Sequence, residues 1–354
     1  MDTSLFDYTL PPELIAQQPI EHRDQSRMLV LARAPLDGGA NVTIGDRNAE
    51  SLIHDRFDRL TEYLREGDLL VFNRTRVLPV RLIGRKADTG GRAECFLLHQ
   101  TAPDVWSCLV KPGRRLQPGT KLVFGQGEME GRIESRTDTG GRLVRFTWQG
   151  DFQTALNHAG QIPLPPYIHE TLADAERYQT VYGDVAGSAA ASTAGLHFTE
   201  KTMASLEAAG IERVMVLLHV GLGTFRPVEA QQVEAHVMHA EYCEVTQEAA
   251  DAVNRAKAEG RRVIAVGTTA LRTLEAHGSG GVLKPGAGWT DIFIYPGYDF
   301  QIVDGLLTNF HLPKSSLLML VSALAGREKV LAAYEEAVRE RYRFFSFGDC
   351  CLIL

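Results

Sequence analysis

Short apolar runs alternate with turn residues between Asp68 and Trp148. Runs such as LLVFN, AECFLL and RLVRFTW have the length of strands, and Gly, Pro or Asp residues separate them. No amphipathic pattern of helical period interrupts this stretch. Short strands at such regular spacing are typical of a small barrel. We therefore predict an all-β domain over residues 67–149.

From Asp151 onward, helical and strand patterns alternate. Apolar stripes of helical period, several with Ser or Thr before them and Gly after them, indicate the helices. They predict helices at 152–159, 203–209, 246–260, 268–277, 315–326 and 327–342, and strands at 214–220, 262–266, 292–295 and 302–307. The five glycines of 277–289 predict a mobile loop. Alternating helices and strands are typical of a layered α/β domain.

The N-terminal segment, residues 1–65, is too short for a core of its own. It contains a strand pattern, MLVLAR, and a helical pattern, LIHDRFDRLTEYL. The economical arrangement pairs this segment with the C-terminal α/β region. We therefore predict an α/β body formed by residues 1–66 plus 150–354, into which the β-barrel of residues 67–149 is inserted.

Composition places the chain among ordinary globular proteins. Its 354 residues are 44% hydrophobic and 23% charged, which suits two folded domains and argues against extensive disorder. No apolar run approaches the ~20 residues of a membrane span, and the N-terminus lacks an apolar signal core. The five cysteines form no CxxC pair. We predict a reduced, cytoplasmic protein without a structural zinc.

Charge is distributed unevenly along the chain. The net charge is −7, but residues 74–145 contain 14 basic and 7 acidic residues, which leaves 23 basic and 37 acidic residues elsewhere. A basic module on an acidic body is expected where one domain meets nucleic-acid phosphates. The alternative is a solvated β-domain surface with a chance excess of arginine. The candidate phosphate contacts are Arg74, Arg76, Arg81, Lys111, Arg114 and Arg115.

The segment GSAAASTAGLHFT, residues 187–199, is rich in small residues and precedes a predicted helix. Small residues allow a backbone to approach a ligand closely, and a helix N-terminus supplies unpaired N–H donors. The pattern by itself indicates a binding loop. Its candidate contacts are Thr193, Gly195, His197 and Phe198.

Two glycine-containing turns follow predicted strands. The run HVGLGTF at 219–225 superficially resembles the first motif of Rossmann methyltransferases. However, His219 stands where that motif has an acidic residue, and Pro227 stands where a helix should begin. The Gly-Thr-Thr turn at 267–269 lies between a strand and a helix and suits hydrogen bonds to a carboxylate, ribose or phosphate. A plain helix cap is the alternative there.

Further polar and aromatic side chains lie near predicted turns. His239 follows another histidine at a spacing of three, but no third and fourth ligands accompany them, so we predict no metal site. His239 and Glu241 are candidates for acid–base roles. Asn309 and His311 could contact a base edge or a ribose, and Tyr295 could stack on adenine or face a sulfonium. Ordinary turn chemistry and core packing are the alternatives.

Several long motifs follow one another along nearly the whole chain. They are LPPELIAQQPIEHRDQSRMLVL (10–31), GDLLVFNRTRVLPVRLIGRK (67–86), LPPYI (164–168), YQTVY (178–182), HVGLGTFRPV (219–228), MHAEYCEV (238–245), RVIAVGTTALRTLE (262–275), TDIFIYPGYDFQIVDGLLTNFHLPKSSLLMLVSALAG (290–326) and YRFFSFGD (342–349). With the loop at 187–199, they resemble the S-adenosylmethionine:tRNA ribosyltransferase-isomerases of queuosine biosynthesis. Two positions depart from the family pattern: Ser192 replaces proline, and Arg74 replaces a small polar or acidic residue.

The resemblance implies a layered α/β/α body with an inserted β-barrel. It implies transfer and isomerisation of the ribosyl group of S-adenosylmethionine onto 7-aminomethyl-7-deazaguanine at the tRNA wobble position. The products would be epoxyqueuosine in tRNA, adenine and methionine. S-adenosylmethionine is then a consumed substrate, and no metal or true cofactor is required. A monomer with tRNA as partner is expected.

The resemblance also adds to the case for particular residues. As catalytic residues we predict His197, His239, Glu241 and His311. For S-adenosylmethionine binding we predict Thr193, Gly195, Phe198, His219, Gly221, Gly223, Thr224, Thr268, Thr269, Tyr295 and Asn309. The basic residues named above are the predicted tRNA contacts. Two alternatives remain: an S-adenosylmethionine-dependent RNA methyltransferase, for which the acidic strand-end residue is absent, and a non-catalytic RNA-binding protein.

Overall fold

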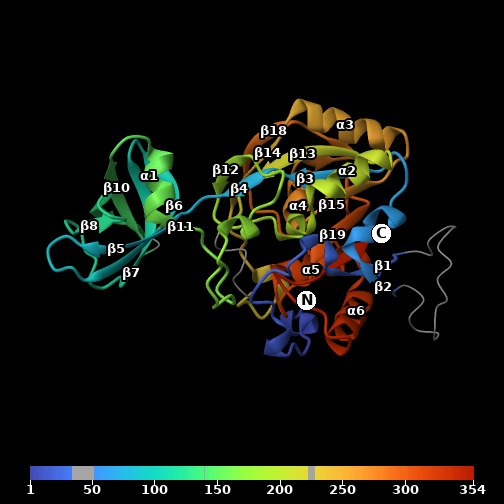
Figure 1. Cartoon of the computed structure of the whole chain (residues 1–354). Coiled ribbons are helices and arrows are strands. Elements are labelled where there is room, and N and C mark those ends of the chain that lie inside the picture. Colours follow the sequence, from blue (N-terminus) through green and yellow to red (C-terminus); the bar gives the residue numbers. More distant parts are fainter. Residues whose placement is uncertain (34–51, 139, 222–227) are drawn as a thin grey trace. The chain divides into compact units, whose positions relative to one another are not determined.

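A computed structural model describes residues 1–33, 52–138, 140–221 and 228–354 of the protein. The chain divides into two compact units (Figure 1). The body comprises Met1–Arg76, Pro165–Ala186 and Ala191–Leu354, and the barrel unit comprises Val77–Leu164 with Gly187–Ala190. The chain passes between them at 76/77 in the short strand β4 (Thr75–Val77), at 164/165, at 186/187 in β12 (Val185–Ser188) and at 190/191.

Within the described residues, the main sheet of the body has nine strands. Their order is β18 (Gly286–Thr290), β14 (Glu241–Val245), β13 (Glu212–Leu218), β3 (Leu69–Asn73), β15 (Val263–Val266), β19 (Gly305–Asn309), β20 (Cys350–Ile353), β1 (Arg27–Leu31) and β2 (Leu52–Arg56). The four central strands β13, β3, β15 and β19 are parallel. Their carboxyl ends therefore meet at one edge of the sheet, where ligands collect in open α/β folds.

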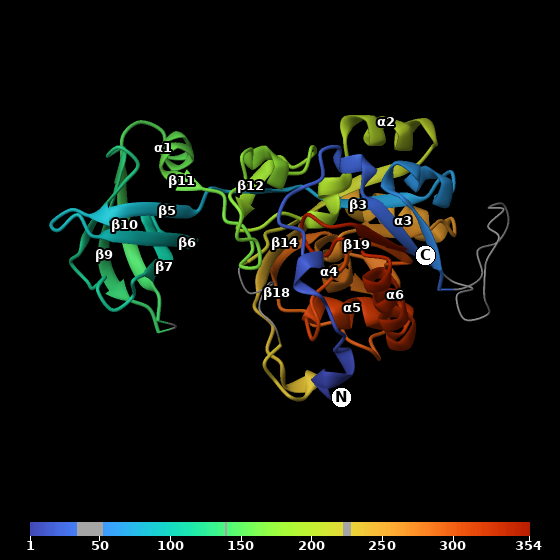
Figure 2. The ribbon, with the colours of Figure 1, turned by 60° about the horizontal axis from the view of Figure 1, so that its bottom comes forward.

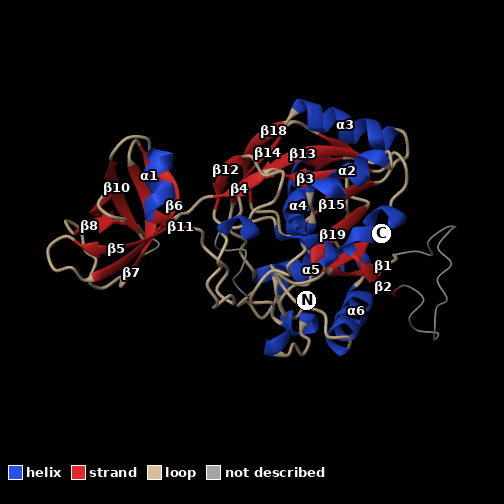
Figure 3. Cartoon of the chain, in the orientation of Figure 1, coloured by secondary structure: helices blue, strands red, loops and turns tan. Residues whose placement is uncertain are grey.

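Both faces of this sheet are covered (Figure 3), as the alternation along β3 shows. Leu69 and Val71 belong to one core cluster, and Leu70 and Phe72 belong to the other. The first cluster includes α3 (Gln247–Ala258), α4 (Thr268–His277), α5 (Ser316–Ala325) and α6 (Arg327–Arg339), and the second includes α2 (Glu200–Ala208) and the 3-10 helix η4 (Phe57–Tyr63). The body is a layered α/β/α structure, as predicted.

The second unit contains a closed antiparallel barrel (Figure 2). Its strands are β5 (Arg81–Lys86), β6 (Arg92–Ala102), β7 (Val105–Lys111), β10 (Arg142–Trp148), β9 (Met129–Arg136) and β8 (Lys121–Phe124), and pairing of β8 with β5 closes the ring. Leu82, Ile133 and Val144 are fully buried in its core. Helix α1 (Phe152–Ala159) packs Leu156 into the same core. The two-residue strand β11 (Gly160–Gln161) pairs with β5.

Several predicted elements differ from the structure. The run LLVFN, assigned to the barrel from the sequence, is β3 at the centre of the body sheet. The pattern LIHDRFDRLTEYL forms β2 and η4 rather than one helix. Residues 292–295 form no strand, whereas the predicted loop at 277–289 contains β16 (Gly278–Ser279), β17 (Val282–Leu283) and the start of β18. The C-terminal strand β20 was not predicted.

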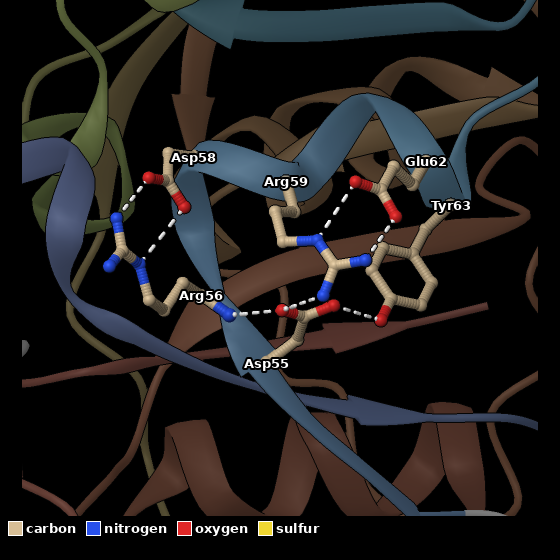
Figure 4. A network of polar contacts seen from close by, with 6 residues as sticks. All are labelled: Asp55, Arg56, Asp58, Arg59, Glu62 and Tyr63. Atoms are coloured by element: carbon tan, nitrogen blue, oxygen red, sulfur yellow. Dashed lines mark hydrogen bonds and ion pairs between the residues drawn. The ribbon is translucent and has the colours of Figure 1, made fainter. Parts of the chain in front are cut away.

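A network of charged side chains stabilises the corner between β2 and η4 (Figure 4). Arg59 contacts Asp55 and Glu62, and the Tyr63 hydroxyl donates to Asp55. Arg59 and Glu62 are exposed, whereas the Asp55 side chain is only 8% exposed, so solvent screens the two pairs of Arg59 to different extents. Residues 52–56 form a strand because they pair with β1, although the apolar positions of the run LIHDRFDRLTEYL have helical spacing.

Short 3-10 helices complete the body. They are η1 (Thr3–Phe6), η2 (Pro12–Leu14), η3 (Arg23–Gln25), η5 (Ala175–Tyr178), η6 (Thr193–His197) and η8 (Val233–Ala235). Helix η6 carries the predicted binding loop into the core beside β19. Across the described ranges, no helix has the length and apolarity that would be needed to cross a bilayer.

Candidate active site

A pocket of the body lies at the carboxyl ends of β15 and β19. It contains about 640 Å³ of space outside protein atoms, part of it open to solvent. Polar groups reach it from several elements that are distant in the sequence. They include Ser192, Thr193, Gly267, Thr268, Thr269, Thr308, Asn309, His311, Ser315 and Ser346. The pocket thus brings together Thr193, Thr268, Thr269, Asn309 and His311 from the predicted site.

The first turn of α4 forms one wall of the pocket. Gly267 has φ +89°, and a Cβ there would lie 2.9 Å from the Ser192 Oγ, so the turn requires glycine. Ser192 and Thr269 hydroxyls are 2.9 Å apart, which joins the η6 loop to the helix. The first-turn N–H groups of a helix lack intrahelical acceptors, and they favour an anionic or hydroxyl ligand. Ser192, the departure from the family pattern, is therefore part of the wall.

His197 lies beside the pocket and is fixed at both ring nitrogens. Its Nδ1 is 2.7 Å from the Ser26 Oγ, and its Nε2 is 3.1 Å from the Asn309 Nδ2. An amide nitrogen only donates, so Nε2 accepts and Nδ1 carries the proton. Burial lowers the pKa of His197 to about 3. The imidazole is therefore neutral, and both of its nitrogens are already engaged.

Asn309, at the end of β19, has a buried acceptor that lacks a partner. Its Nδ2 donates to His197 and to the Phe345 carbonyl at 3.2 Å. Its Oδ1 is buried and has no hydrogen-bond partner among the described residues. An unsatisfied buried acceptor costs about 1–3 kcal/mol, so the structure favours a ligand donor at this wall.

His311 lines the pocket and differs from His197 in one respect. Its Nε2 is 2.8 Å from the Thr308 Oγ1, whereas no described residue bonds its Nδ1. Its main chain is held by Tyr334, whose hydroxyl accepts from the His311 N–H, and by Tyr8, whose hydroxyl donates to the His311 carbonyl. Burial lowers the pKa of His311 to about 3.

Glu241 forms a buried ion pair with Arg272 of α4 and does not line the pocket. One carboxylate oxygen accepts from Arg272, and the other accepts from the Gly221 N–H at 2.8 Å. Arg272 was not predicted as a site residue. Its Nε and Nη2 are buried and have no partner among the described residues. The pair fixes α4 against β14, which positions the first turn of the helix.

The other predicted ligand contacts that the structure describes do not line the pocket. His219 is 2.9 Å from the Thr75 hydroxyl at the end of β13, and burial lowers its pKa. Phe198 packs in the core against Phe57 and Phe72. The remaining residues are placed as follows: Gly195 lies against Tyr182, Tyr295 packs against Phe293, His239 is exposed, and Gly223 and Thr224 fall outside the described residues.

The six predicted phosphate contacts separate into two groups. Arg74, Arg76 and Arg81 are neutralised by Asp184, Glu176 and Glu94, respectively, at 2.5–2.9 Å. Arg74 and Arg76 also belong to the body unit. The second group, Lys111, Arg114 and Arg115, is exposed and forms no ion pair with any described residue. The charge available to a partner on the barrel is therefore concentrated at 111–115.

A search of the described ranges finds no group of three His, Cys, Asp or Glu residues that could hold a metal ion. In particular, His239 has no such set of neighbours. The candidate site is therefore built from hydroxyl, amide, imidazole and main-chain groups.

The chain is similar over its full length to known proteins. A family model described as "Queuosine biosynthesis protein" matches residues 3–353. The chain is 56% identical to the S-adenosylmethionine:tRNA ribosyltransferase-isomerase of Carboxydothermus hydrogenoformans, over 99% of this chain and 98% of the relative. The corresponding Heliobacterium modesticaldum protein is 54% identical over 100% of both chains. The crystal structure of S-adenosylmethionine tRNA ribosyltransferase from Thermotoga maritima is 36% identical, with a TM-score of 0.54 over 99% of this chain and 100% of that one.

Proposed function

We propose that this chain, which belongs to the queuosine biosynthesis protein family, is an S-adenosylmethionine:tRNA ribosyltransferase-isomerase. The observation that carries this function is identity above 50% to proteins of that name along the whole chain. The enzyme transfers and isomerises the ribosyl group of S-adenosylmethionine onto 7-aminomethyl-7-deazaguanine at the tRNA wobble position. It forms epoxyqueuosine and releases adenine and methionine.

The pocket of the body is the proposed S-adenosylmethionine site. The N–H groups of Thr268 and Thr269 in the first turn of α4 suit the carboxylate or the ribose hydroxyls. Asn309 supplies an acceptor for an N–H donor of the substrate, either the ammonium or the adenine amino group. His197 acts as a positioning residue because its Nε2 holds the amide in place.

His311 is the proposed acid–base group of the pocket. The sulfonium acidifies the ribose 5′ carbon, so a positioned base generates an ylide, and the neutral aminomethyl group of the tRNA is one such base. Adenine departs as a proton reaches its ring nitrogens. The ylide breaks the C4′–O4′ bond as adenine leaves, which gives a C1′ aldehyde and a vinyl sulfonium. The aminomethyl nitrogen of the tRNA then adds to C4′ of the vinyl sulfonium and loses its proton, so the bond to the tRNA forms and the ylide is regenerated. The ylide carbon attacks the C1′ aldehyde, and the resulting alkoxide displaces methionine to close the epoxide. Hydroxyls such as Thr193 and Thr308 are placed to stabilise the charge that moves in these steps.

Product analysis tests this function directly. The enzyme is incubated with S-adenosylmethionine and tRNA carrying 7-aminomethyl-7-deazaguanine, and the small molecules are quantified by chromatography. We expect adenine and methionine in equal amounts with modified tRNA. S-adenosylhomocysteine as the main product would identify a methyltransferase, and tRNA binding without either product would identify a binding protein.

A further inference from the structure

A second recess of the body adjoins the pocket and is bordered by arginine. It contains about 280 Å³ of space outside protein atoms, part of it open to solvent, and is lined by Arg23, Arg177 and His197, among others. Ser346 lines both the recess and the pocket. Two guanidinium groups from distant segments therefore line one hollow. A third, that of Arg343, donates to the carbonyl of Gln18, which precedes the lining residue Pro19.

These arginines donate to main-chain carbonyls instead of carboxylates. Arg23 donates to the Gln179 carbonyl at 3.0 Å, and Arg177 donates to the Glu21 carbonyl at 2.9 Å. Neither these two side chains nor Arg343 forms an ion pair with any residue in the described ranges. The Arg177 Nε is also buried without a described partner. Carbonyl groups orient a guanidinium, but they do not neutralise its charge.

The carboxylates that act electrostatically on Arg23 and Arg343 have other partners. Glu176 pairs with Arg76 at 2.6 Å, and Asp174 caps η5 through the Glu176 N–H. Asp349 is buried and accepts the main-chain N–H groups of Arg27 and Arg343. Desolvation lowers the pKa of Arg23 and Arg343, which shows that these cations are partly withdrawn from water without full compensation. An anion in the recess would supply that compensation.

We propose that this recess, which Arg23 and Arg177 line, binds a backbone phosphate of the RNA substrate. The proposal rests on the proposed function for the identity of the RNA. Because the recess shares Ser346 with the pocket, a phosphate bound there would hold the nucleotide chain beside the reacting ribosyl group. It would also give the acidic body its own contact with RNA, separate from the exposed cations of the barrel.

Salt-dependent tRNA binding tests the proposal. The variants are Arg23→Gln, Arg177→Gln and the double variant, and the probe is tRNA carrying 7-aminomethyl-7-deazaguanine at four salt concentrations. Each phosphate that the protein no longer neutralises reduces the slope of log K against log salt by about 0.7–0.9. We expect that reduction in the double variant, with roughly tenfold weaker tRNA binding at low salt. Affinity for S-adenosylmethionine should be unchanged.

Matched variants separate phosphate binding from a structural role. Arg213→Gln removes an exposed arginine at the start of β13, paired with Glu207, and should leave the slope unchanged. Arg23→Lys retains the charge and should restore most of the slope. An unchanged slope in a folded double variant overturns the proposal. So does loss of S-adenosylmethionine affinity with an unchanged slope, which would assign the recess to that substrate. Binding slopes need no turnover, so failure of the proposed reaction would appear separately as absent adenine.

Discussion

Two buried histidines at the candidate site are held neutral, but their remaining hydrogen-bonding capacity differs. His197 uses both ring nitrogens within the wall, whereas the Nδ1 of His311 has no partner among the described residues. The sequence predicts a catalytic role for both, although His197 stands in a loop rich in small residues and His311 in a polar-aromatic turn. This difference in hydrogen-bonding capacity is the basis for the positioning role that we propose for His197 and the chemical role that we propose for His311.

The neutral histidines predict a stability loss in mild acid. Burial lowers the pKa of His197 and His311 to about 3, below the ordinary value of 6.5. The unfolded chain therefore binds more protons below pH 6.5, so their stabilisation is complete above that pH and is lost as the pH falls toward 3. Each histidine lowers the free energy of unfolding by up to about 1.4 kcal/mol for every pH unit of acidification in this range. Urea unfolding at pH 7, 6 and 5 measures this loss.

A His197→Gln variant serves as the comparison for that experiment. Glutamine keeps a donor and an acceptor but does not titrate. The slope of the free energy of unfolding against pH should therefore fall by about the contribution of one histidine. His219, His236 and His277 contribute in the same direction in both proteins. An identical slope in wild type and variant would show that His197 is not buried as a neutral group.

Asn309→Ala should weaken S-adenosylmethionine binding. The change removes the unpaired acceptor of the pocket wall, and we expect an affinity loss of roughly 5- to 100-fold in calorimetric titration. Asn254→Ala is the matched control, because the Asn254 amide of α3 bonds the main chain of Leu283 and does not line the pocket. If both variants lose stability but bind S-adenosylmethionine as wild type does, Asn309 is a structural residue only.

At the scale of elements, a buried arginine orders the loop of the barrel that carries the exposed cations. Arg142 of β10 is buried and donates to the carbonyls of Gly113, Leu116, Gly140 and Gly141. It therefore holds the segment that carries the exposed cations at 111–115. Its own positive charge remains without a carboxylate partner in the described part of the chain. Because carbonyl groups and not carboxylates order this loop, no described acidic side chain neutralises its exposed cations.

Arg114→Gln combined with Arg115→Gln should reduce tRNA affinity. We expect the salt slope of binding to fall by about 0.7–0.9 for each phosphate that these arginines neutralise in the wild type, while S-adenosylmethionine affinity remains unchanged. Arg145→Gln is the control, because Glu134 already pairs with Arg145 at 2.6 Å on the same barrel. Equal slopes for the double variant and wild type would remove this loop from the RNA interface.

The helices of the body were largely predictable, whereas some strands were not. Thr246 and Gly260 mark the ends of α3 in the sequence, and α4 begins at the Gly-Thr-Thr turn. Such signals are local. The run LLVFN of β3 is apolar at four consecutive positions, which is typical of a central strand buried on both faces, whereas barrel strands alternate. The strand-like runs that follow it along the chain nevertheless led to its assignment to the barrel. Its pairing with β13 and β15 places it in the body sheet.

At the scale of the whole molecule, charge along the sequence overstates the basic surface. Arg74 pairs with Asp184, which is 110 residues away, and Arg76 pairs with Glu176. The uncompensated arginines Arg23 and Arg343 instead come from an acidic part of the chain. Tertiary contacts determine which arginines are paired with carboxylates. Composition therefore could not identify either the paired arginines or those that lack a carboxylate partner. The polar turns of the pocket were identified because each one ends a strand or begins a helix.

The Asn309 amide fixes the chemical sign of the pocket wall. Carbonyl oxygens of Phe345 and Asp349, at 3.2 and 3.4 Å from its Nδ2, can only accept, so they prevent the amide from rotating by half a turn. At this residue the pocket therefore presents the amide oxygen and not the amide nitrogen. In the proposed substrate complex, an analogue with an acceptor in place of the donor would face the Asn309 oxygen, and two carbonyls behind the amide would enforce discrimination against it.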